Sequence, residues 1–338
     1  MKSSDTIRWG IIGCGAVTEV KSGPAYQNTP GFELAAVMRR DLSLAKDYAQ
    51  RHQVLSYSND ANDIIFNNDI DAIYIATPPD SHKHYALLVA EAGKPCCIEK
   101  PLAPSYQECL SITQAFSAKK LPLFVAYYRR SLPRFTKVKS LLEQGAIGEI
   151  RHISWHLSKP ANALDLSGEY NWRTDKAIAL GGYFDDLASH GLDLFAFLLG
   201  DFQKVSGVAA NQQGYYSAFD AVSACWLHAN GITGVGSWNF GASSRQDKVT
   251  IYGSAGEITF SVFDEVAITL TTHDVRQGTH QASAKIITEE IFIENPEHIQ
   301  RFHVENISRH LVHNEQHPST GETALHTSWV MDEILTQS

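Results

Sequence analysis

The sequence lacks the features that would mark a secreted, disulfide-bonded or membrane-spanning protein. Its five cysteines are odd in number and include no Cys-x-x-Cys pair. They therefore favour buried thiols in a reducing compartment over a disulfide framework. No run reaches the ~18 apolar residues that cross a bilayer, and the start of the chain has no apolar core of a secretory signal. We expect a cytoplasmic protein with no membrane partner.

Positive charge is also scarce. The chain has 28 lysines and arginines against 37 aspartates and glutamates, a formal net charge of −9 at pH 7. That balance favours solubility and argues against nucleic acid as a partner. The 43% hydrophobic content indicates an ordered globular protein, and 338 residues exceed one typical core. We therefore expect two domains, residues 1–126 and residues 127–338.

The first third alternates short apolar runs with helical segments, which is typical of a parallel sheet with crossover helices in the α/β class. The expected strands are Ile7–Ile12, Phe32–Met38, Val54–Tyr57, Ala72–Ala76, Cys96–Ile98 and Leu123–Ala126. The expected helices are Val17–Gln27, Ser43–Arg51, Asn59–Asn67, His82–Ala92 and Tyr106–Lys119.

After about Tyr127 the pattern changes to successive strands separated by turns. This indicates an α+β domain with an antiparallel sheet and helices on one face. The expected strands are Val208–Ala210, Ala221–Leu227, Gly234–Asn239, Lys248–Tyr252, Ile258–Phe263 and Val266–Thr271. The expected helices are Arg134–Glu143, one within Gly181–Leu199, Phe302–Val312 and Ala324–Ile334. The other face of such a sheet needs cover, so we expect pairing with a second copy of the chain.

The first expected strand runs into the glycine turn Gly13–Thr18. Glycine at 13 allows a tight turn, and glycine at 15 lets the backbone approach a pyrophosphate. The helix that follows would offer N–H groups and the positive end of its dipole to the phosphates. Thr18 replaces the third glycine of this motif. The surrounding strands and helix favour dinucleotide binding over an ordinary turn, with Gly13, Gly15, Ala16 and Val17 against the cofactor.

The residues after the second strand bear on the choice of nucleotide. An NAD site usually presents a carboxylate here to the ribose hydroxyls, whereas an arginine accommodates a 2′-phosphate. Arg39 stands where the acid is expected, with Arg40 beside it. Asp41 would serve NAD if the register shifted by two residues, so NAD stays open. We expect NADP(H) to be preferred.

Three ionisable residues indicate a proton relay. Lys100 follows the strand Cys96–Ile98, at the edge where an open α/β sheet binds its ligand. Asp186 and His190 are four residues apart, on one face of an expected helix. Hydride transfer from a carbinol carbon needs a base for the hydroxyl proton, and histidine titrates near neutrality. An isolated Asp-x-x-x-His would be a structural pair, but together with Lys100 it favours catalysis.

These motifs occur in an order that resembles the glucose–fructose oxidoreductase/inositol dehydrogenase (Gfo/Idh/MocA) family over almost the whole chain. After the glycine turn come Ala76–His82, Gly93-Lys94-Pro95, Glu99-Lys100-Pro101, Tyr127–Arg130, Trp172-Arg173, Gly181-Gly182, Asp186–Asp193 and Ser319–Glu322.

The resemblance implies an N-terminal Rossmann domain with a doubly wound parallel sheet and a C-terminal domain with a large open antiparallel sheet. It implies an NAD(P)-dependent oxidoreductase acting on CH–OH groups, with Lys100, Asp186 and His190 catalytic. Thr77, Pro78, His82 and Glu99 match positions on the cofactor side. Two departures stand out, because Tyr183 replaces a glycine and Asp185 adds an acid beside Asp186. The family's open sheet often mediates dimers or tetramers, so a homodimer or homotetramer is expected.

Aromatic and basic residues are candidates for the substrate pocket. Tyr128, Trp172 and Arg173 suit a polyol, since an aromatic ring covers a sugar face and arginine binds hydroxyls or an acid. An ordinary domain junction would use the same residues. His310, His313 and His317 have no matching acid–cysteine set, so we expect no metal.

The sequence as a whole predicts hydride transfer between NADP(H) and a small-molecule sugar, polyol or related cyclic hydroxy compound. An NAD-dependent version, a dihydrodiol dehydrogenase-like activity and a non-catalytic dinucleotide-binding sensor remain as alternatives. The substrate and the direction of reaction are not specified by these residues.

Overall fold

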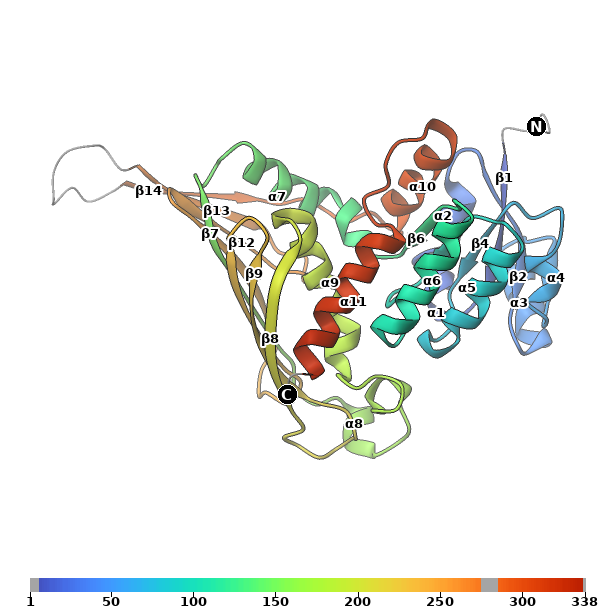
Figure 1. Cartoon of the computed structure of the whole chain (residues 1–338), viewed down its shortest axis with the longest axis horizontal. Helices are drawn as coiled ribbons and strands as arrows, with labels where there is room; N and C mark the ends of the chain where they lie inside the picture. The colour runs from blue at the N-terminus through green and yellow to red at the C-terminus, as the bar shows by residue number, and fades with distance from the viewer. Residues whose placement is uncertain (1–5, 275–284, 337–338) are drawn as a thin grey trace. The chain divides into compact units, whose positions relative to one another are not determined.

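The computed structural model describes residues 6–274 and 285–336, which form two compact units (Figure 1). The first unit takes the chain up to Leu132 together with Pro296–Ser328, and the second takes Pro133–Asn295 and the residues from Trp329 onward. The sequence placed the boundary at 126 and kept the C-terminal segment in the second domain. That segment joins the first unit because Val304 and Ile307 are fully buried in its core.

The first unit contains a six-stranded sheet in the order β3-β2-β1-β4-β5-β6, and every neighbouring pair is parallel. The strands are β1 (Ile7–Ile12), β2 (Phe32–Met38), β3 (Ser56–Ser58), β4 (Ala72–Ile75), β5 (Cys96–Ile98) and β6 (Leu123–Val125). The order reverses between β1 and β4, which is the doubly wound arrangement. The Rossmann fold class predicted from the sequence is confirmed.

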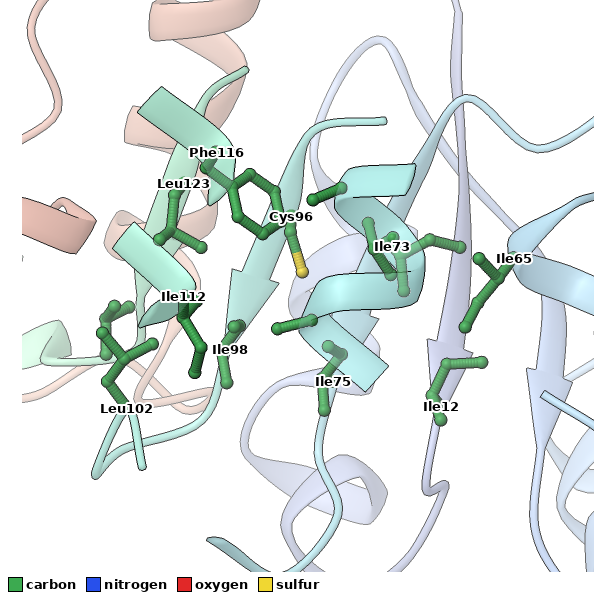
Figure 2. Packing of buried hydrophobic residues seen from close by; sticks show 14 of the residues in the cluster. Ile12, Ile65, Ile73, Ile75, Cys96, Ile98, Leu102, Ile112, Phe116 and Leu123 are labelled. Carbon is green, nitrogen blue, oxygen red and sulfur yellow. The ribbon is translucent and has the colours of Figure 1, made fainter. Parts of the chain in front are cut away.

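Helices cover both faces of this sheet. They are α1 (Ala16–Val20), α2 (Gly23–Asn28), α3 (Leu42–Arg51), α4 (Asn62–Ile65), α5 (His82–Glu91), α6 (Tyr106–Ala118) and α10 (Arg301–His313). One core cluster packs Ile73 and Ile75 against α4, α5 and α6 (Figure 2). The other packs Trp9 against Tyr26 and Val304 on the opposite face.

Two helix predictions in this unit need correction. The expected helix Val17–Gln27 is two helices, α1 and α2, because Pro24 has no N–H to continue the first one. The expected helix Asn59–Asn67 shortens to α4, whose start follows an Asp60 side chain that bonds the Asn62 N–H and so forms a turn.

The second unit contains an eight-stranded sheet in the order β14-β13-β12-β11-β7-β10-β9-β8. Its strands are β7 (Ile150–Ser158), β8 (Phe202–Ala210), β9 (Ala221–His228), β10 (Thr233–Asn239), β11 (Gln246–Gly253), β12 (Gly256–Phe260), β13 (Ile268–Asp274) and β14 (Lys285–Ile291). The predicted antiparallel sheet is confirmed for most pairs, but β7 and β10 pair in parallel. The sequence prediction also missed β7 and β14.

The helices of the second unit position the residues of interest. They are α7 (Pro133–Glu143), α8 (Ala163–Ser167) and α9 (Tyr183–Leu199); α11 (Gly321–Thr336) crosses the division between the units after Ser328. Helix α9 packs closely on the sheet, because a Cβ at Gly191 would come within 2.3 Å of the Trp155 ring. Phe184 lies against Trp238 with ring centroids 4.9 Å apart. These contacts hold α9 in a fixed rotation on the sheet.

The opposite face of the second sheet carries side chains that alternate with the core residues. Val208, Val235 and Tyr252 are 64%, 43% and 39% exposed on β8, β10 and β11. His152 and His156 share this face and bond to hydroxyl groups of β10. Within the part of the chain that the structure describes, no helix has the length and apolar character needed to cross a bilayer.

Candidate active site

The glycine turn joins β1 to α1 in a form that excludes side chains. Gly13 has φ 94°, and a Cβ there would lie 2.7 Å from the Thr77 methyl carbon. Its N–H donates to the Met38 carbonyl at 2.9 Å. Beside Gly15 the space is open, since the nearest atom to an added Cβ would be 3.8 Å away. A phosphate can therefore approach the backbone at Gly15.

Thr18 closes this turn. Its hydroxyl accepts from the Gly15 N–H at 3.0 Å and donates to the Gly15 carbonyl at 2.9 Å. The Tyr48 hydroxyl donates to the Thr18 carbonyl at 2.9 Å. Thr18 therefore closes the turn by hydrogen bonding to Gly15, at the position where the motif usually has its third glycine. Because α1 has only five residues, phosphate binding at this turn would depend on its N–H groups more than on a long helix dipole.

A cavity of about 410 Å³ opens at the carboxyl ends of β1, β2 and β4. It is lined by six of the predicted cofactor residues, namely Gly13, Gly15, Arg39, Arg40, Thr77 and Pro78. The other lining residues are Cys14, Met38, Asp41, Leu44, Ala76, Asp80, Ser81 and Tyr85. A second cavity of about 430 Å³ shares Met38, Arg40 and Tyr85 with it. Asp80, Ser81 and Tyr85 were not predicted as cofactor residues, although all three lie within seven residues of Pro78.

The acidic residue after β2 is already engaged. One oxygen of the Asp41 carboxylate accepts from the Ser43 hydroxyl at 2.6 Å and from the N–H groups of Ser43 and Leu44. These bonds cap α3 and lower the pKa of Asp41. Arg39 is half-buried and Arg40 is exposed at the same cavity.

His82 lies below the ends of β4 and β5 and is fully buried. Its Nε2 is 2.8 Å from the Thr77 carbonyl, and its Nδ1 is 3.0 Å from the Pro101 carbonyl. Burial lowers the pKa of His82, so the ring is neutral and donates from one nitrogen. The ring links the loops after the two strands. His82 thus contacts backbone on both sides.

Glu99 is held by two buried neighbours. The Tyr74 hydroxyl donates to its carboxylate at 2.7 Å, and the Gln300 amide donates at 2.6 Å. The Lys100 N–H donates to the second oxygen at 3.2 Å. Glu99 and Gln300 are only 8% and 1% exposed. The carboxylate thus anchors the backbone at Lys100, whose side chain is half-buried.

Gln300 was not identified from the sequence, because nothing local connects it to Glu99. Its backbone N–H donates to the Lys21 carbonyl, and His298 Nδ1 lies 2.9 Å from the Val20 carbonyl. The returning segment therefore contacts both the helix of the phosphate turn and the strand end that carries Lys100.

Asp186 and His190 lie one turn apart on α9, in the second unit. The Asp186 carboxylate is 3.6 Å from Nε of Arg173, whose guanidinium lies 4.2 Å from the centre of the Trp172 ring. His190 is 5% exposed, with its ring 6.1 Å from that of Phe263. The unit thus joins four of the predicted residues, Trp172, Arg173, Asp186 and His190. Lys100 and Tyr128 belong to the first unit.

The two departures from the family pattern have structural partners. Asp185 accepts from the Gly181 N–H at 2.8 Å, and burial together with Asp332 and Asp186 raises its pKa to about 7. The Tyr183 hydroxyl donates to Asp165 at 2.6 Å. Asp185 thus bonds the turn before α9, whereas Asp186 faces Arg173.

Comparison with known proteins identifies the family of this chain. Residues 7–127 match a model described as an oxidoreductase family with an NAD-binding Rossmann fold, and residues 135–259 match the GFO/IDH/MocA C-terminal domain. The chain belongs to the Gfo/Idh/MocA family of oxidoreductases. It is 35% identical over 327 residues to oxidoreductase P35 of Formosa agariphila, covering 96% of this chain and 97% of that protein.

Levoglucosan dehydrogenase is similar to this chain in both sequence and fold. Levoglucosan dehydrogenase of Pseudarthrobacter phenanthrenivorans is 29% identical over 285 residues, covering 75% of this chain and 73% of that protein. A solved structure of levoglucosan dehydrogenase in complex with NADH superposes with a TM-score of 0.86 at 22% identity, covering 98% and 96% of the two chains. This structural likeness establishes a shared fold.

Proposed function

We propose that this oxidoreductase transfers a hydride between NADP(H) and a CH–OH group of a sugar, polyol or related cyclic hydroxy compound. The observation that carries the proposal is Asp186, which lies one turn before His190 on α9 and faces the Arg173–Trp172 stack. The family supplies a nicotinamide-binding fold in the first unit, and a relative of similar length is named a dehydrogenase of the sugar derivative levoglucosan.

The residues of the first cavity fit a dinucleotide. The pyrophosphate would lie against the open backbone at Gly15, with the N–H groups of Ala16 and Val17 as donors, because the Gly13 and Gly15 N–H groups already bond to Met38 and Thr18. Thr77 and Pro78 would contact the nucleotide from the end of β4. Bound nicotinamide would supply the acceptor or donor of the hydride. We assign His82 and Glu99 to positioning, because both are buried and bond to neighbouring protein groups.

The arginines support NADP(H) as the preferred nucleotide. Arg39 and Arg40 line the cavity where the adenosine ribose is expected, and a guanidinium binds a phosphate with two parallel bonds. Asp41 caps α3 with one carboxylate oxygen, which leaves the other for the ribose hydroxyls of NAD and keeps NAD as the alternative. A solved structure of levoglucosan dehydrogenase contains NADH, so NAD(H) stays as the alternative nucleotide.

The proton would pass through the second unit. His190 accepts the hydroxyl proton of the substrate during oxidation. Asp186 orients the His190 ring. The Lys100 ammonium lowers the pKa of the same hydroxyl by donating a hydrogen bond to its oxygen. Tyr128, Trp172 and Arg173 would line the substrate pocket, with aromatic faces against C–H groups and the guanidinium toward hydroxyl groups.

The decisive experiment is a cofactor-consumption screen against sugars, inositols and dihydrodiols, with NADP and NAD in parallel. A Lys100→Met variant serves as the control for background oxidation. Turnover of a sugar or polyol by the wild type, lost in the variant, would support the assignment. Nucleotide binding without turnover of any compound would favour the sensor alternative.

We further propose that the chain forms a homodimer or homotetramer through the exposed face of the second sheet. Val208, Val235 and Tyr252 are exposed on that face, and exposed apolar side chains are stabilised when a partner covers them.

A further inference from the structure

A separate cavity of about 300 Å³ lies wholly within the second unit. It forms between α8, the short 3₁₀ turn Trp172–Thr174 and the loop from β8 to β9. A pyranose ring fits a space of this size.

The rim of the cavity is aromatic. Tyr170 is 74% exposed and Tyr215 is 49% exposed, and both line the cavity. The hydroxyl of a third tyrosine, Tyr216, is buried with no hydrogen-bond partner among the described residues. Exposed aromatic faces of this kind bury apolar area when the C–H face of a sugar ring packs on them.

The polar groups at the cavity include hydrogen-bond donors and acceptors, and its charged side chains are all acidic. Glu169 and Asp175 line it with carboxylates, and no lysine or arginine is among its lining residues. Among the described residues, the Ala177 N–H donates to one oxygen of Asp175 at 3.0 Å. Carboxylates accept hydrogen bonds from neutral hydroxyl groups and repel anions. This composition suits an uncharged polyhydroxy ring.

The walls are held in place before any ligand arrives. Asp165 accepts from the Tyr183 hydroxyl at 2.6 Å and from the Asn162 N–H at 2.9 Å. Asn211 donates to the Tyr216 carbonyl at 2.6 Å and to the Ala218 carbonyl at 2.8 Å. A pre-formed wall lowers the ordering cost of binding.

One short 3₁₀ turn connects the cavity to Asp186. Asn171 and Thr174 line the cavity, and Arg173 between them faces Asp186. Tyr183, which bonds to the wall residue Asp165, is one helical turn before Asp186. The 3₁₀ turn thus contributes Thr174 to the cavity and Arg173 to the contact with Asp186.

We propose that this cavity binds a second, uncharged sugar ring of a glycoside whose first ring is oxidised at Asp186 and His190. The location of the oxidised ring rests on the proposed function; the cavity as a sugar site does not. The preferred substrate class is accordingly a glycoside of at least two rings.

The test compares glucose with the disaccharides cellobiose, maltose and lactose on the full chain, by saturation-transfer NMR and by turnover. A Tyr170→Ala/Tyr215→Ala double variant removes the aromatic rim. Tyr57→Ala is the matched control, because Tyr57 is 40% exposed and lies on β3. We expect the double variant to lose at least tenfold in disaccharide affinity, with glucose affinity within twofold and the control unchanged.

Absence of disaccharide binding by the wild type, or equal losses for glucose and disaccharide, would overturn the inference. So would binding of tetramethylammonium at the two tyrosines in place of sugar, because that would assign the cavity to cations. Rim-dependent disaccharide binding without turnover of any sugar would instead refute the proposed function and leave the sugar site standing.

Discussion

The Gln300 side chain donates a 2.6 Å hydrogen bond to the carboxylate of Glu99, a residue 201 positions earlier in the chain. The bond is buried, and Glu99 in turn bonds the backbone of Lys100. The position of the proposed catalytic lysine thus depends on a segment that is synthesised near the end of the chain.

Gln300→Ala should leave the Glu99 carboxylate short of a donor and lower the unfolding free energy by about 1–3 kcal/mol. Turnover should fall about tenfold at unchanged nucleotide affinity, because Lys100 would lose its anchor. Gln300→Glu should be worse at pH 8 than at pH 6. Two adjacent buried carboxylates raise each other's pKa, so the folded state loses stability as pH rises. Gln144→Ala, at an exposed glutamine, is the control; equal effects from both alanine variants would contradict the anchoring role.

Arg39→Ala combined with Arg40→Ala should weaken NADP binding by about 1.5–3 kcal/mol, since charge-assisted bonds to the 2′-phosphate are lost. NAD affinity should change much less. Calorimetric titration of both nucleotides into both proteins measures the difference, with Arg151→Ala as an exposed control. Wild-type affinity for NAD equal to or above that for NADP would rule out the proposed preference.

Lys100→Met and His190→Ala should each lower turnover by roughly two to four orders of magnitude. The double variant should be little worse than the worse single one, because residues that act as a unit are not additive. Asp186→Asn should have a smaller effect if Asp186 only orients His190, and a larger one if Asp186 takes the proton. Nucleotide affinity is the internal control. Near wild-type turnover in Lys100→Met would disprove the relay.

The raised pKa of Asp185 makes stability depend on pH. The folded-state pKa of about 7 exceeds the ordinary value of a carboxyl group, so the folded state binds the proton more tightly. This contribution is fully present below about pH 4 and is lost as pH rises through 7. Asp185→Asn should therefore flatten the unfolding free energy between pH 4 and pH 7, measured in urea at several pH values. Asp80→Asn, at an exposed carboxylate, should keep the wild-type slope.

Val235→Lys should dissociate the proposed oligomer, because it places a charge in the middle of the exposed face of the second sheet. Val312→Lys, at a 53% exposed position on α10, is the matched control. Sedimentation at micromolar concentration measures the result. A wild-type sample that contains only the 37.4 kDa monomer would contradict the assembly.

The sequence predicted best where the determinants are local. The strand before Gly13 and the buried strand Cys96–Ile98 were placed correctly, because each is a short apolar run bounded by turn residues. Strand β7 was missed although Ile153, Trp155 and Leu157 alternate along it. This alternation of apolar and polar residues is the usual signal of a half-buried strand, so the sequence contained the information for β7 although the strand was not predicted.

Contacts between residues far apart in the chain could not be predicted from the local sequence pattern. The parallel pairing of β7 with β10 joins residues about 80 positions apart, and Gln300 reaches Glu99 across most of the chain. Neither leaves a local signal, because the partner of a buried polar group is chosen by the tertiary fold. The sequence identified Tyr183 as a departure from the family pattern, and the structure shows its hydrogen bond to Asp165.

The discontinuity of the first unit also bears on the order in which the chain folds. Its aromatic core around Trp9 and Tyr26 includes Val304 and Ile307 from the returning segment. On a ribosome, the nucleotide-binding half is made first yet stays incomplete on that face until the last tenth of the chain emerges. The Rossmann unit therefore cannot complete its core during synthesis before most of the second unit has also been made.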